Sequence, residues 1–90
     1  MMFLSLFKKK NKISINIKLL AGLDKIAGYN PETGITLETV EGTRLKNVLK
    51  QIELPQDQPL SFLINGNKVS ARERLQNGDE VFCFLPFAGG

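Results

Sequence analysis

The clearest secondary-structure signal in this chain is the stretch at residues 13–19, ISINIKL. Its apolar residues alternate with polar ones, in the order Ile13, Ser14, Ile15, Asn16, Ile17, Lys18 and Leu19. Successive side chains of a strand point to opposite faces, so a period of two predicts a β-strand with one buried face. We therefore expect this strand to belong to a sheet with a hydrophobic core packed on one of its faces.

The residues after this strand predict a loop and then a second strand. Residues 21–34 are rich in glycine, asparagine and proline, which favours a loop, with Leu23, Ile26 and Tyr29 as apolar anchors to the body. The β-branched residues within Ile35–Val40 predict a strand, closed by Glu41-Gly42. We expect the two strands to pair in antiparallel orientation.

A helix is predicted next. Apolar residues recur at helical spacing, at Leu45, Val48, Leu49 and Ile52. Thr43 is a candidate N-cap because its side-chain oxygen can accept from the free amides of the first helical turn. Pro55 cannot continue a helix, since it lacks an amide hydrogen, and marks the latest point at which this one ends.

The second half of the chain predicts three more strands. Leu60, Phe62 and Ile64 alternate with Ser61, Leu63 and Asn65, and Asn65-Gly66-Asn67 has the chemistry of a tight hairpin turn. A short return strand is expected at residues 68–70. A turn at residues 77–79 then leads into a final strand, Glu80–Leu85.

This order of elements favours an α+β class, in which one main helix packs on a mixed sheet of four or five strands. The β-grasp arrangement fits this pattern. We expect an N-terminal extension at residues 1–12, one domain at residues 13–86 and a C-terminal tail at residues 87–90. A chain of 90 residues has room for one domain with a modest core.

The net charge of +3 comes largely from one basic run, at Lys8, Lys9, Lys10 and Lys12. A basic run near a chain end can bind nucleic acid or anionic lipid, but a solvated tail is the simpler interpretation, so no nucleic-acid or membrane role is predicted. The apolar residues 1–7 are too few for a membrane span, and their charges follow the apolar stretch, unlike a secretory signal. A short membrane-surface or partner-docking helix is the alternative.

Residues able to perform catalysis are scarce. The chain has no histidine, which is the usual general base, and its single cysteine cannot form a metal site alone. Cys83 lies between Phe82 and Phe84, where burial would leave the thiol unreactive, so we interpret it as a core residue. One cysteine also excludes an internal disulfide and is compatible with a cytoplasmic protein. An enzyme, a bound cofactor and a metal site are therefore not predicted.

The C-terminus is the remaining candidate for chemistry. Pro86 cannot donate to a sheet ladder, so strand pairing should stop there. Gly89-Gly90 has no side chains and can enter a narrow channel, where the terminal carboxylate would become an acyl donor once activated. The alternative is that terminal glycines are simply a disordered end.

Three ordered motifs strengthen the first interpretation. They are Ile64-Asn65-Gly66-Asn67-Lys68-Val69, then Leu75-Gln76-Asn77-Gly78-Asp79-Glu80-Val81, then Leu85-Pro86-Phe87-Ala88-Gly89-Gly90. Together they resemble the MoaD/ThiS family of ubiquitin-like sulfur carrier proteins, over about residues 13–90. Because the motifs occur in the family's order and end at the terminal glycine, the resemblance is more specific than any one of them.

The resemblance implies a β-grasp fold and a terminal glycine, Gly90, that becomes an adenylate and then a thiocarboxylate, with Gly89 as the thin segment beside it. A ubiquitin-activating-type enzyme would use ATP for this step. In the MoaD branch the tail serves the large subunit of molybdopterin synthase, and in the ThiS branch it serves thiamine thiazole synthesis. Pro86 and the long loop at residues 21–34 favour the MoaD branch, although Phe87 and residues 1–12 depart from its usual pattern.

The final strand also predicts a surface for partners. If Val81, Cys83 and Leu85 face the helix, then Phe82 and Phe84 face the other side of the sheet. By the same counting Leu63 and Leu20 lie on that face, and we expect it to bind partners together with Pro86, Phe87 and Ala88. The alternative is that the loop at residues 21–34, or Phe3, Leu4, Leu6 and Phe7, covers it.

Two other functions stay open at this point. The chain would be a β-grasp binding module if its sheet face docked a partner while the tail was inert. It would be a ubiquitin-like modifier if the activated terminus were joined to lysines of other proteins.

Overall fold

The computed structural model describes residues 11–20, 23–25, 28–52, 54 and 59–86. The predicted extension at residues 1–12 and the tail at residues 87–90 fall mostly outside these ranges, so the domain boundaries stay a prediction. The described elements are β1 (Lys12–Leu19), β2 (Ile35–Val40), α2 (Leu45–Leu49), β3 (Ser61–Ile64), β4 (Asn67–Val69) and β5 (Glu80–Phe84).

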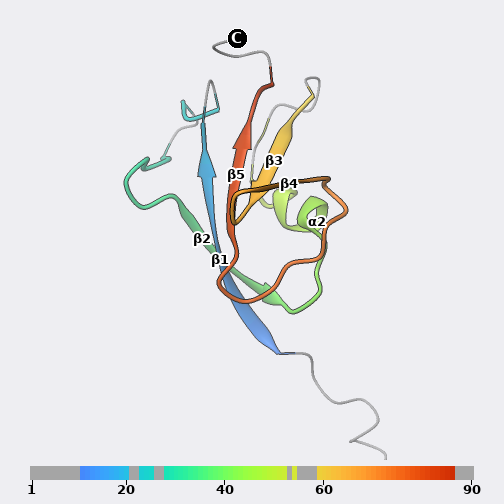
Figure 1. The fold of residues 1–90 in the computed structure, drawn as a ribbon. Coiled ribbons are helices and arrows are strands. Elements are labelled where there is room, and N and C mark those ends of the chain that lie inside the picture. The colour runs from blue at the N-terminus through green and yellow to red at the C-terminus, as the bar shows by residue number, and fades with distance from the viewer. Residues whose placement is uncertain (1–10, 21–22, 26–27, 53, 55–58, 87–90) are drawn as a thin grey trace, which may run out of the picture.

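The five strands form one mixed sheet in the order β2-β1-β5-β3-β4 (Figure 1). β1 pairs with β2 in antiparallel register, with Ile15 opposite Leu37, as predicted. β1 and β5 are parallel, with Ile17 opposite Val81. β3 pairs with both β5 and β4 in antiparallel orientation. The strand that leads to the C-terminus therefore lies in the middle of the sheet.

The core lies on one face of this sheet. The apolar residues of the ISINIKL stretch are all buried, with exposed fractions of 0–3%. Leu45 and Val48 of α2 pack into the same cluster, and so does Leu75, from the segment between β4 and β5. The prediction of a half-buried first strand is confirmed.

The loop after β1 is attached to the core, as predicted. Leu23 is buried in the core cluster, and Tyr29 packs against it. The backbone amides of Asn16 and Leu20 donate to carbonyls on the β5 side of β1. Successive amides of a strand point in opposite directions, so the Leu19 amide points to the β2 side. It lies past the first residue of β2. The Tyr29 hydroxyl accepts from this amide at 2.8 Å. Ile26 lies outside the described residues.

The turns also follow the predicted chemistry. Asn65 and Gly66 join β3 to β4 with φ of +50° and +87°, the pair of positive angles that a two-residue hairpin turn requires. Gly78, with φ of +85°, lies in the turn before β5, which the Asp79 amide closes by donating to the Gln76 carbonyl at 3.1 Å. Both predicted turns are confirmed.

The prediction of Thr43 as N-cap is wrong. α2 begins at Leu45 with Arg44 in the cap position, and Arg44 makes no capping hydrogen bond with its side chain. The Thr43 hydroxyl instead donates to the Val40 carbonyl at 2.7 Å, and the Thr43 carbonyl accepts from the Leu75 amide at 2.8 Å. Thr43 belongs to the turn after β2 because its backbone is paired with a segment from the other half of the chain.

Candidate functional site

β5 determines where the C-terminal segment leaves the domain. The strand ends at Phe84, Leu85 is half-buried, and Pro86 is exposed in a turn. Pairing therefore stops before the proline, as predicted. Four of the predicted site residues, Phe87, Ala88, Gly89 and Gly90, lie outside the described residues.

The two faces of β5 have different environments. Val81 and Cys83 are fully buried in the core, whereas Phe82 and Phe84 are half-buried on the opposite face. In the register, Phe82 lies between Lys18 of β1 and Leu63 of β3. The predicted orientation of Phe82 and Phe84 is confirmed.

We call Leu20, Leu63, Phe82 and Phe84 the open-face cluster, because they lie on the face of the sheet away from α2. Leu20 continues β1 one residue beyond the Leu19–Cys83 pair and is 40% exposed, although its side chain is large and apolar. Leu63, Phe82 and Phe84 are each half-buried. The structure thus brings together on one face all four apolar residues that the strand periodicity predicted there.

The described part of the loop at residues 23–34 places two large apolar side chains at the core. Its buried Leu23 belongs to the core cluster, and Tyr29 packs against the same cluster. The N-terminal residues Phe3, Leu4, Leu6 and Phe7 lie outside the described residues. Leu20 stays accessible next to this loop.

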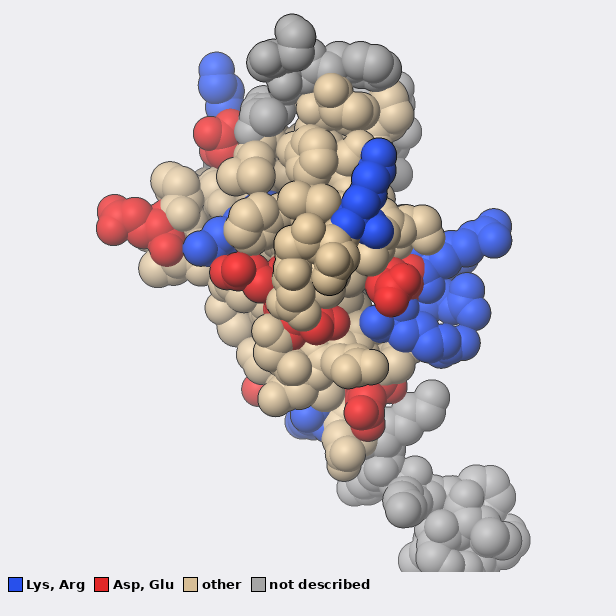
Figure 2. Space-filling model, in the orientation of Figure 1, with Lys and Arg blue, Asp and Glu red and all other residues tan. Residues whose placement is uncertain are grey.

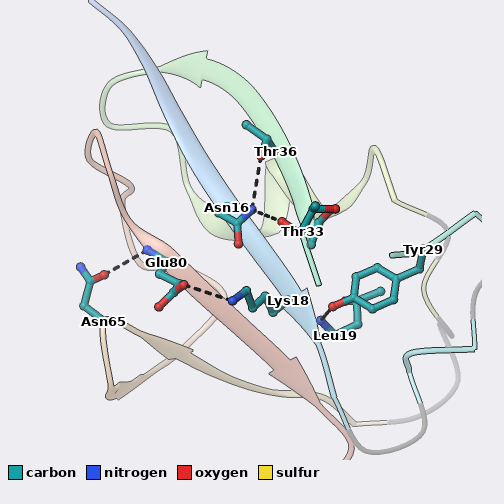
Figure 3. A network of polar contacts seen from close by, with 9 residues as sticks. Asn16, Lys18, Leu19, Tyr29, Thr33, Thr36, Asn65 and Glu80 are labelled. Carbon is teal, nitrogen blue, oxygen red and sulfur yellow. Dashed lines mark hydrogen bonds and ion pairs between the residues drawn. The ribbon is translucent and has the colours of Figure 1, made fainter. Parts of the chain in front are cut away.

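Polar residues beside the open-face cluster position β5 (Figure 3). The Asn65 side chain accepts from the Glu80 amide at 3.0 Å and donates to the Asp79 carboxylate at 2.9 Å. Lys18 Nζ lies 3.7 Å from the Glu80 carboxylate, an exposed ion pair that contributes little to stability. The hairpin turn after β3 and the turn before β5 are thereby bonded directly, a contact that sequence reasoning missed.

Cys83 is a core residue and not a nucleophile. Its side chain is fully buried, and this burial raises the pKa of the Cys83 thiol from an ordinary value of 9.0 to about 12. Desolvation disfavours the charged thiolate, which is the reactive form. The interpretation of Cys83 as an inert core cysteine is confirmed.

The turn motifs, the central final strand and the mixed sheet all agree with one family. The model of the ThiS family matches residues 17–90 of the chain. The chain belongs to the ThiS family. In this ThiS-family chain the match extends over the whole described sheet after Asn16 and continues to Gly90, the residue predicted to carry the acyl group.

A solved structure confirms the fold. The chain is similar to the crystal structure of SAMP1 from Haloferax volcanii, with a TM-score of 0.63 and 22% sequence identity. The similarity covers 86% of this chain and 99% of that one. A search of curated proteins found no match. The mixed five-stranded sheet with its short helix is a β-grasp, ubiquitin-like fold, as predicted.

The family sets the general role. ThiS-family proteins are ubiquitin-like sulfur carriers or modifiers, which are generally not catalysts and which interact with an activating enzyme and an acceptor. Among the described residues, no helix has the length and apolar character needed to cross a membrane.

Proposed function

We propose that this chain is a sulfur carrier for molybdopterin biosynthesis and that Gly90 bears the transferred sulfur. The single observation that supports it best is the family match, which reaches the end of the chain at Gly89-Gly90. A terminal glycine following another glycine presents a carboxylate with no neighbouring side chain to obstruct a narrow active site.

The proposed chemistry has two steps, both performed by partners. The Gly90 carboxylate attacks the α-phosphorus of ATP in a ubiquitin-activating-type enzyme, which forms an acyl adenylate and releases pyrophosphate. Sulfide then attacks the acyl carbon and displaces AMP, leaving a terminal thiocarboxylate. The carrier binds neither a metal nor a cofactor of its own in this scheme, and ATP belongs to the activating enzyme.

The open-face cluster is the proposed docking surface for these partners. Phe82 and Phe84 are large aromatic side chains on a central strand, and such residues often dominate the energetics of an interface. Their position next to Pro86 places a docked partner near the point where the chain leaves the sheet. Phe87 and Ala88 would extend the contact along the tail towards the active site.

The proposed acceptor is the large subunit of molybdopterin synthase, because Pro86 and the long segment between β1 and β2 favour the MoaD branch. A ThiS-type carrier for thiamine thiazole synthesis is the second candidate, and the family match does not distinguish between the two branches. Incubating the thiocarboxylate form separately with each acceptor enzyme and its substrate distinguishes them by which product gains sulfur.

The first experiment tests the tail chemistry. Purified chain is incubated with an activating enzyme, ATP and a sulfide donor, and intact-protein mass spectrometry should show one carboxylate oxygen of Gly90 replaced by sulfur. A variant with one alanine added after Gly90 is the matched control and should stay unmodified. Absence of the modification with every cognate activating enzyme, or sulfur transfer from the unprocessed extended variant, would contradict the proposal.

A further inference from the structure

Two segments that are distant in the sequence, residues 42–46 and 71–75, lie side by side. Arg44 and Arg74 form an isolated antiparallel bridge. The flanking backbone hydrogen bonds are Gly42 N to Leu75 O at 3.0 Å, Leu75 N to Thr43 O at 2.8 Å, Leu45 N to Glu73 O at 2.9 Å and Lys46 N to Ala71 O at 2.8 Å. These bonds fix the positions of the two backbones relative to each other.

This pairing gathers all three arginines of the chain. Arg72 and Arg74 are exposed, and Arg44 is half-buried. Lys46, at the second position of α2, is exposed beside them. We call Arg44, Lys46, Arg72 and Arg74 the arginine patch. Figure 2 shows Lys and Arg side chains gathered on the side of the molecule where Figure 1 draws α2.

The charge of the arginine patch is not neutralised within the described part of the chain. The two segments carry four cationic side chains and one carboxylate, Glu73. Among the described residues the one ion pair is that of Lys18 with Glu80, so no described carboxylate pairs with the patch. Arg74 Nη1 donates to the Gly42 carbonyl at 3.0 Å, which orients one guanidinium without cancelling its charge.

The chemistry of the arginine patch favours carboxylates of a protein over nucleic acid. Guanidinium groups form paired hydrogen bonds with carboxylates and with phosphates alike, so the neighbouring residues decide between the two kinds of partner. Single-stranded nucleic acid is usually bound with aromatic side chains on which bases stack, and the patch has none. Reading a duplex groove usually needs a longer helix than α2, which has five residues.

We propose that the arginine patch binds an acidic segment of a partner protein. α2 packs on the core face of the sheet, opposite the open-face cluster, so the two surfaces are separate. A partner held by the arginine patch leaves Phe82 and Phe84 accessible to a second protein. This assignment does not depend on the chemistry at Gly90.

The test uses the full-length chain and poly-L-glutamate as the acidic probe, followed by NMR and calorimetry. We expect backbone shifts at residues 44–46 and 71–75. The double variant Lys46→Gln/Arg72→Gln should bind with a Kd raised by about tenfold or more, since each lost charge pair weakens binding. It leaves the bonded Arg74 in place. Lys8→Gln/Lys9→Gln removes the same charge elsewhere and should change the Kd by less than about twofold.

Three outcomes would overturn the proposal. Shifts confined to residues 8–12 would assign acidic binding to the N-terminal basic run. Equal Kd values for the two double variants would mean that the arginine patch contributes nothing specific. Tighter binding of a single-stranded oligothymidylate at residues 44–46 and 71–75 would assign the patch to nucleic acid. Thiocarboxylate formation is measured separately by mass, so a failure of the proposed function is distinguished from a failure here.

Discussion

At the residue scale, Gly34 closes the loop against the sheet immediately before β2. Its φ is +70°, and a Cβ built there would lie 2.8 Å from the Ile17 carbonyl oxygen and 3.0 Å from Asn16 Oδ1. The Gly34 amide also donates to the Asn30 carbonyl at 2.8 Å. Because the nearest obstacle is backbone of the interior strand β1, an added methyl group cannot be accommodated by moving a side chain.

Gly34→Ala should therefore destabilise the protein more than an alanine at another glycine with positive φ. Gly42 is the matched control, since its φ is +87° and nothing lies within 4 Å of its Cβ position. We expect Gly42→Ala to lower the free energy of unfolding by about 1 kcal/mol and Gly34→Ala by at least about 2 kcal/mol. Urea denaturation measures both, and equal losses would contradict the steric argument.

Cys83 makes stability depend on pH in the alkaline range. The pKa of the folded thiol is about 12 against an ordinary 9.0, so between these values the unfolded thiol has lost its proton and the folded one has kept it. The contribution of this group to the free energy of unfolding is fully present below about pH 9. Above that pH it falls by about 1.4 kcal/mol per pH unit. Cys83→Ala should remove that part of the slope in urea denaturation curves.

The same burial predicts slow alkylation. Native protein at pH 8 should react with iodoacetamide only as fast as it unfolds, because the thiolate is absent from the folded state. In denaturant the reaction should be complete and rapid. Rapid modification of the native protein would mean that Cys83 is accessible, which would contradict its place in the core.

At the element scale, β5 performs two tasks through its two faces. Val81 and Cys83 join the core, while Phe82 and Phe84 extend the open-face cluster. The Asn65 and Asp79 side chains bond the β3–β4 turn to the turn before β5, so the start of β5 is positioned by the β3–β4 hairpin. Two motifs that are separate in the sequence thus form one structural unit.

Phe82→Ser should reduce docking while leaving the core intact. We expect the rate of sulfur transfer to fall by about tenfold or more, because a central aromatic side chain of an interface is lost. Val40→Ser is the matched control, since Val40 is an apolar residue, 42% exposed, on the same face of the edge strand β2. Equal transfer rates for the two folded variants would contradict the docking role of the open-face cluster.

At the scale of the whole molecule, the last strand in sequence lies between β1 and β3, so the C-terminal segment emerges from the centre of the sheet. Parallel pairing of β1 with β5 requires a long connection, and the intervening residues supply β2, α2, β3 and β4. A strand bonded on both sides resists separation better than an edge strand. The domain thereby provides a rigid base for the terminal residues.

Deleting Gly89-Gly90 should separate chemistry from stability. The last apolar residue that packs against the core within the described chain is Leu85, so we expect an unchanged melting temperature and complete loss of thiocarboxylate formation. Deleting residues 80–90 should unfold the domain because it removes the central strand. If the shorter deletion kept full biological function, the chain would be a binding module with an inert tail.

Much of the fold was predictable because its signals are local. The alternation in residues 13–19 is read within one strand, and Asn65-Gly66 specifies a hairpin turn by its own backbone angles. The facing of Phe82 and Phe84 followed from the same period of two. Thr43 was assigned wrongly because its backbone pairs with Leu75, a contact between distant residues that has no local pattern.

By itself the sequence determined the strands, the tight turns, the buried thiol and, through its ordered motifs, the family, since each depends on neighbouring residues or on their order along the chain. Only the tertiary structure placed β5 beside β1 and joined Arg44 to Arg74. The physical reason is that pairing between distant segments depends on how the whole core packs around α2, and no short stretch of the chain contains that information.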